Sequence, residues 1–138
     1  MRSFREFLDY YLNIWRESSL IDLKNIISSD YKAREISNGV VDDFGFTESI
    51  LGWEQGFNYA IENKAKWDIQ ELAIIPLKDD EKMVILSATM IIDNKSLDSA
   101  NIFFQTFKRN TDNNWKLVRS YIEAGISTSN IAEINFFK

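Results

Sequence analysis

Near residue 64 the hydrophobic pattern of the chain changes to that of consecutive strands, and this change fixes the order of the predicted elements. Before it, apolar residues mostly recur every three or four positions, as in helices that bury one face. After it, runs rich in β-branched and aromatic residues alternate with short polar turns, as in strands. The sequence therefore predicts an α+β fold in which helices precede a sheet of consecutive strands.

The strongest helix prediction covers SFREFLDYYLNIWRE, residues 3–17. Its apolar residues recur at i, i+3, i+4 and i+7, and Ser3 is placed to cap the first turn. A second short helix is expected after Ser19, which with Asp22 three residues later resembles a capping box. The segment 30–45 then predicts a short pair of strands around a turn at Ser-Asn-Gly.

A third helix is predicted over residues 47–65, with Thr47 as its cap. Gly52 and Gly56 lie four residues apart on one face of it. Two glycines inside a helix cost about 1 kcal/mol each relative to alanine, so a close approach of some other group would explain them. We expect that group to be the sheet, with a ligand as the alternative.

Four strands are predicted in the second half, over residues 67–77, 83–93, 100–109 and 115–126. Short loops join them, which favours an antiparallel meander. The tail, residues 127–138, ends in apolar residues that would need a surface to cover. That surface is either the sheet or a second subunit.

Composition narrows the possible functions. A length of 138 residues suits a single domain, residues 1–138, and the net charge of −5 disfavours nucleic acid and anionic membranes as partners. The chain has no Cys and no His, so thiolate nucleophiles, imidazole bases and the metal sites that use either are excluded. We expect no cofactor and no metal. The sequence shows no signal peptide or membrane span, which favours a cytoplasmic location.

The last predicted strand, WKLVRSYIEAGI, residues 115–126, would place a polar row on one face. Strict alternation puts Trp115, Leu117, Arg119, Tyr121 and Glu123 together. Either the row lines a pocket, where Arg119 would hold an anionic or carbonyl group, or it faces solvent or a partner. Arg119 and Glu123 would lie about 13 Å apart at ~3.3 Å per residue, so they are not an ion pair in a regular strand.

The element order, together with Trp115, Lys116, Leu117 and Val118 in the closing strand, resembles the nuclear transport factor 2-like, or cystatin-like, superfamily. The resemblance implies a curved antiparallel sheet wrapped around the N-terminal helices, forming a cone with an interior pocket. It also implies dimerisation through the outer face of the sheet. Enzymes of the superfamily use His, Asp, Tyr or Arg groups, but this chain matches none of those sets completely, and Asn114 stands where many members have Gly.

Our first functional hypothesis is a small-molecule-binding protein. Its cone would hold an apolar or aromatic ligand in an aromatic-lined pocket, and two copies would form a homodimer through the sheet. The alternatives are a cofactor-independent lyase or isomerase that uses Tyr and carboxylate groups, and a protein-interaction module. No catalytic residue is assigned. The candidate pocket residues are Tyr11, Trp15, Tyr31, Trp53, Phe57, Trp115, Arg119, Tyr121 and Glu123.

Overall fold

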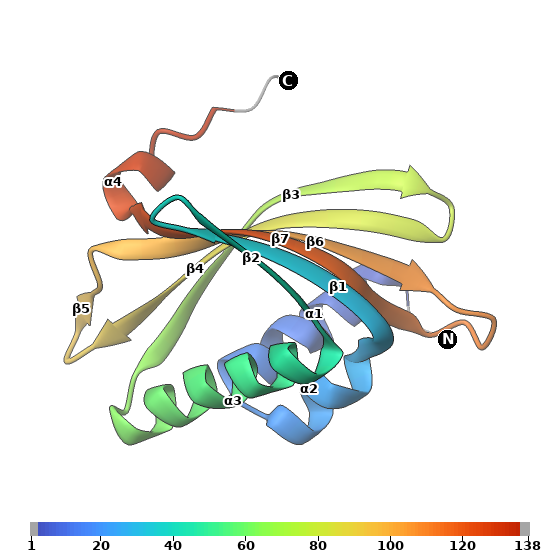
Figure 1. Cartoon of the computed structure of the whole chain (residues 1–138), viewed down its shortest axis with the longest axis horizontal. Helices are drawn as coiled ribbons and strands as arrows, with labels where there is room; N and C mark the ends of the chain where they lie inside the picture. Colours follow the sequence, from blue (N-terminus) through green and yellow to red (C-terminus); the bar gives the residue numbers. More distant parts are fainter. Residues whose placement is uncertain (1–2, 136–138) are drawn as a thin grey trace.

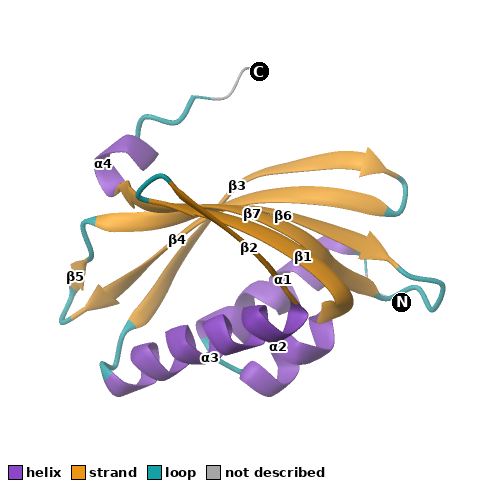
Figure 2. Ribbon diagram, in the orientation of Figure 1, coloured by secondary structure: helices purple, strands orange, loops and turns teal. Residues whose placement is uncertain are grey.

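Figure 1 shows the computed structural model of the protein, in which residues 3–135 are described. Helices lie against one face of a curved sheet, as Figure 2 shows by colour. We call the opposite face of the sheet its outer face. The elements in chain order are α1 (Phe4–Arg16), α2 (Leu20–Ile26), β1 (Ile27–Ser37), β2 (Val40–Gly45), α3 (Phe46–Glu62), β3 (Lys66–Lys78), β4 (Glu81–Ile92), β5 (Lys95–Ser96), β6 (Ser99–Arg109), β7 (Trp115–Ser127) and α4 (Thr128–Ile131).

The predicted helices form where the apolar periodicity places them. Ser3 caps α1 in a complete capping box with Glu6, as expected from the sequence. At the start of α2, the Ser19 hydroxyl donates to Asp22 instead of capping a backbone N–H. Helix α3 begins at Phe46 with Gly45 in the capping position, so the prediction of Thr47 as the cap was wrong.

The sheet has the order β2-β1-β7-β6-β4-β3, and the short strand β5 pairs with β4. The pairings β3–β4, β4–β6 and β6–β7 are antiparallel, which confirms the predicted meander. Strand β1 pairs with β7 in parallel, so the N-terminal hairpin joins the meander along its last strand. The β1–β2 turn uses Asn38 and Gly39, whose φ angles of 50° and 76° suit a type I′ hairpin.

A β-bulge in β7 changes the face to which its side chains point. Phe107 of β6 lies opposite Leu117, but Thr106, one residue back, lies opposite Arg119. Val118 is therefore an extra residue, and the alternation reverses there. Leu117 is fully buried, while Arg119 is exposed. The prediction that Trp115, Leu117, Arg119, Tyr121 and Glu123 share one face was wrong, because strict alternation does not continue through a bulge.

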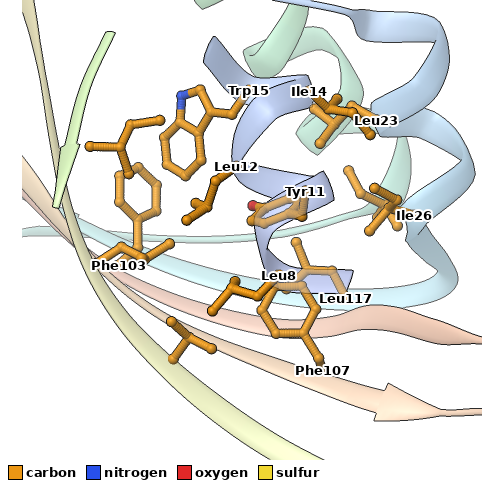
Figure 3. Packing of buried hydrophobic residues seen from close by; sticks show 14 of the residues in the cluster. Leu8, Tyr11, Leu12, Ile14, Trp15, Leu23, Ile26, Phe103, Phe107 and Leu117 are labelled. Atoms are coloured by element: carbon orange, nitrogen blue, oxygen red, sulfur yellow. The ribbon is translucent and has the colours of Figure 1, made fainter. Parts of the chain in front are cut away.

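The core lies between α1 and the helix-covered face of the sheet. Figure 3 shows Tyr11 and Trp15 of α1 directed toward this face, with Phe103 and Phe107 among the strand residues they meet. The rings of Tyr11 and Phe107 are 5.2 Å apart and those of Trp15 and Phe103 are 5.1 Å apart, both edge to face. Such pairs add to the free energy gained by burying the rings. Aromatic packing thus helps to hold the helix against the sheet.

After β7, the backbone N–H of Thr128 donates to the carbonyl oxygen of Asp98 at 2.9 Å. Residues 128–131 form α4. The first residue of the predicted tail, Ser127, is still part of β7. The expected covering role of Phe136 and Phe137 lies outside the described residues. No helix within residues 3–135 has the length and apolar character needed to cross a membrane.

Candidate functional site

A cavity of about 830 Å³ opens between α3 and one end of the curved sheet. Its lining comes from α3, from the β1–β2 hairpin and from the ends of β4, β6 and β7 nearest to that hairpin. Pockets that bind small molecules commonly have volumes of roughly 300–1,000 Å³. The cavity is therefore large enough for a ligand of several rings.

Aromatic rings form much of the wall. Trp15 lies at the centre, with its ring 4.8 Å from Trp53, 6.0 Å from Trp67 and 5.1 Å from Phe103. All three contacts are edge to face. Phe44 of β2 completes this part of the lining. A set of packed rings forms a rigid apolar surface, because each ring is held by its neighbours.

The floor of the cavity carries one buried amide. Gln105 is only 1% exposed, and its Oε1 accepts a hydrogen bond of 2.8 Å from the Tyr11 hydroxyl. Burial raises the pKa of Tyr11, so that this hydroxyl remains a protonated donor. Beyond this bond, Gln105 has the two N–H donors of its amide and the second lone pair of Oε1.

The two glycines of α3 lie at the cavity and do not pack closely against the sheet. A methyl group built at Gly52 would meet no atom within 4 Å in the described part of the chain, and one at Gly56 would meet only the edge of Trp67, at 3.9 Å. Both residues line the cavity. The expectation of close helix–sheet packing at these glycines was wrong. They keep this side of the cavity open instead.

The charged residues of the lining are all acidic: Glu35, Asp42, Asp43 and Glu48. Arg34 donates to both carboxylate oxygens of Asp43 at 2.7 and 2.8 Å, which lowers the pKa of Asp43. Burial, with a smaller contribution from the charge of Asp42, raises the pKa of Glu35. Glu35 is thus a partly buried carboxylate at a cavity wall.

A tyrosine hydroxyl also faces this region. Tyr31 is 4% exposed and lines the cavity from β1. Burial raises the pKa of Tyr31, and the nearby hydroxyls of Ser120 and Ser49 act in the opposite direction. The phenol is therefore a neutral donor at physiological pH.

The structure brings three of the nine predicted pocket residues to the cavity, namely Trp15, Tyr31 and Trp53. Tyr11 and Phe57 lie directly behind this lining, where Tyr11 bonds to Gln105 and the Phe57 ring is 5.5 Å from that of Trp53. Because both are buried, they support the lining residues from the core.

None of the four predicted residues on β7 lines this cavity. Arg119 and Tyr121 instead line, with Tyr31, a second pocket of about 890 Å³. Trp115 is buried beside Phe4, with the ring centres 4.9 Å apart. Arg119 is on the outer face and pairs with Glu81, and Tyr121, which is also exposed, donates to Glu123. The bulge at Val118 is the reason that Arg119 and Tyr121 point away from the helices.

Several lining residues were not among the predicted pocket residues, chiefly Glu35, Phe44, Trp67, Phe103 and Gln105. Gln105 carried a usable signal, since a polar residue within the apolar run IFFQTF needs a partner if it is buried. Trp67 carried none, because a tryptophan at the start of a strand can face either side. Its Nε1 donates to Ser18 at 3.1 Å, a contact between segments far apart in the sequence.

Solved structures from several bacteria share this architecture. A protein from Novosphingobium aromaticivorans, described as NTF2-like with a cystatin-like fold, superposes with a TM-score of 0.67 at 12% identity, over 96% of this chain and 87% of that one. The chain has the nuclear transport factor 2-like fold. An NTF2-like protein of unknown function in nutrient uptake from Rhodospirillum rubrum matches with a TM-score of 0.63 at 14% identity, over 89% of this chain and 98% of that one.

The nuclear transport factor 2-like fold does not determine the activity, since one fold hosts many functions. A domain of unknown function with a cystatin-like fold from Nostoc punctiforme matches with a TM-score of 0.66 at 9% identity, over 94% of this chain and 80% of that one. The sequence matches no model of a protein family and no curated protein. Function must therefore be argued from the cavity itself.

Proposed function

We propose that this protein binds a small, largely apolar or aromatic molecule in the cavity between α3 and the sheet. The observation that carries the proposal is a cavity of about 830 Å³ with walls of packed aromatic rings. Burial of a flat apolar ligand against such rings is favourable, and the Gln105 amide can orient a polar group on it. The open space at Gly52 supports the same role.

The test compares two substitutions on the same helix. Gly52→Phe places a phenyl ring at the cavity wall. The control, Leu51→Phe, places the same ring at the preceding residue, which is exposed and does not line the cavity. Native mass spectrometry of freshly purified protein reports any co-purified ligand, and titration with the neutral dye Nile red reports apolar binding. We expect wild type and Leu51→Phe to bind, and Gly52→Phe to lose affinity at least tenfold. Equal binding by all three proteins, or no binding by wild type, would reject the proposal.

The second candidate is a cofactor-independent lyase or isomerase, and Glu35 is the observation that favours it. A carboxylate whose pKa is raised by burial is suited to remove a proton near neutral pH, and Tyr31 is a phenol at the same cavity. Such an enzyme would exchange an acidic C–H next to a carbonyl for deuterium in D₂O. Exchange into a panel of cyclic ketones that is lost in Glu35→Gln would support it, and exchange that survives the substitution would contradict it.

We also propose that two copies associate through the outer face of the sheet. Ile75 and Tyr121 are exposed there at 37% and 39%, and the Tyr121 ring packs 5.9 Å from that of Phe104. Sedimentation equilibrium of wild type and Phe104→Glu tests this, with the substitution expected to yield monomers. A wild-type monomer would leave the face available to another protein, as in the interaction-module alternative.

A further inference from the structure

We propose that the ligand is an organic cation, with an apolar body among the rings and an ammonium group among the carboxylates of the lining. This inference rests on the proposed ligand-binding function and adds the charge of the ligand. It reverses the expectation drawn from Arg119, which would have selected an anionic or carbonyl group.

The first support is the charge of the lining. Four carboxylates line the cavity, and of the described residues no Lys or Arg does so. Arg34 neutralises Asp43 from outside the lining. Within residues 3–135, none of Glu35, Asp42 and Glu48 forms an ion pair. An anionic ligand would be repelled here, and a cationic one would be attracted.

The second support is the position of Glu35. This carboxylate lies partly buried beside Asp42, and both its burial and its neighbour disfavour its charge. A bound ammonium group would offset both effects, because its positive charge favours the ionised carboxylate. Within the described chain, no three carboxylates come close enough together to hold a metal ion.

The third support is independent of the carboxylates. The same cavity is walled by Trp15, Trp53, Trp67 and Phe44, and the face of an aromatic ring attracts a cation, most strongly for tryptophan. A ring that packs edge to face against its neighbour, as Trp53 does against Trp15, is fixed in orientation. Rings and carboxylates together form the surroundings that an alkylammonium ion prefers.

The experiment uses three probes with the same body and different charge: tetralin, α-aminotetralin as its ammonium ion, and the tetralin carboxylate substituted at the same carbon. Dissociation constants are measured by protein-observed NMR at low salt. We expect the ammonium ion to bind at least tenfold more tightly than tetralin, and the carboxylate to bind least. Of the three probes, only the ammonium ion should bind more weakly when salt is added.

A pair of double variants separates local charge from net charge. Glu35→Gln with Asp42→Asn should reduce the affinity for the ammonium ion to that for tetralin. The control, Glu54→Gln with Asp79→Asn, changes the net charge equally at exposed residues outside the cavity lining and should bind like wild type. Thermal melts confirm that each variant is folded.

The outcomes distinguish the two proposals. If tetralin and the ammonium ion bind equally, or the carboxylate binds best, the cation inference is overturned while ligand binding stands. The same holds if the control pair lowers the affinity as much as the cavity pair. If none of the three probes binds, the ligand-binding proposal fails as well.

Discussion

Tyr11 donates a hydrogen bond of 2.8 Å to Oε1 of Gln105, and both side chains are at most 1% exposed. Tyr11→Phe would leave the buried amide oxygen without its partner, at a cost of roughly 1–3 kcal/mol in the free energy of unfolding. Urea denaturation measures this loss. Adding Gln105→Met should recover most of it, since removing both polar partners is nearly neutral. A single variant as stable as wild type would show that the bond contributes nothing.

Gly52 and Gly39 are predicted to respond in opposite directions to alanine. Neither added methyl group would have an atom within 4 Å among the described residues, so only the backbone differs. Gly52 is helical, and Gly52→Ala should stabilise the protein by up to about 1 kcal/mol. Gly39 has φ of +76°, where alanine is strained, and Gly39→Ala should cost about 1–2 kcal/mol. Thermal melts compare the two, and changes of the same sign would contradict the prediction.

Glu35→Gln should stabilise the protein at pH 7. The folded state raises the pKa of Glu35, so the contribution of this group is favourable below its unfolded pKa and is lost as pH rises through the folded value. The variant should therefore match wild type near pH 4 and exceed it in urea midpoint at about pH 7. Glu54→Gln, at an exposed position of α3, serves as the control. A gain that is the same at both pH values would argue against titration of Glu35.

Arg119→Ala should lower stability and leave ligand affinity unchanged. Glu81 is 7% exposed, and its carboxylate would lose its ion-pair partner. Because the Arg119 side chain is 55% exposed, solvent screens the pair, and the cost should be about 1 kcal/mol. Urea denaturation and a Nile red titration measure the two effects. Weakened dye binding would contradict this prediction and assign Arg119 a part in ligand binding.

The sequence was informative wherever one periodic pattern runs through a whole element. The apolar spacing of residues 3–17 and the short loops between strands predicted α1 and the meander correctly, because burial of one face requires such patterns. The bulge at Val118 was missed, because the two adjacent apolar residues Leu117 and Val118 do not by themselves show that the strand takes an extra residue there. One extra residue then moved Arg119 and Tyr121 to the opposite face.

The candidate site was only partly predictable for a similar reason. Trp15 and Trp53 belong to the buried stripes of two predicted helices, which placed them near any cavity that the helices cover. The acidic wall depends on how the β1–β2 hairpin meets α3, and that meeting is a tertiary contact with no local signature. Gly52 was misassigned because a glycine within a helix reports the need for space and not which group uses it.

The parallel pairing of β1 with β7 has a consequence for how the molecule assembles. Ile27 and Leu117 are partners across this ladder although about 90 residues separate them in the chain. Closing so long a loop is entropically costly, and contacts of this kind form late in folding. During synthesis on a ribosome, β1 and β6 would each present an unpaired edge until β7 emerges. We expect chaperones to bind first at those two edges, and incorrect strand pairing to begin there.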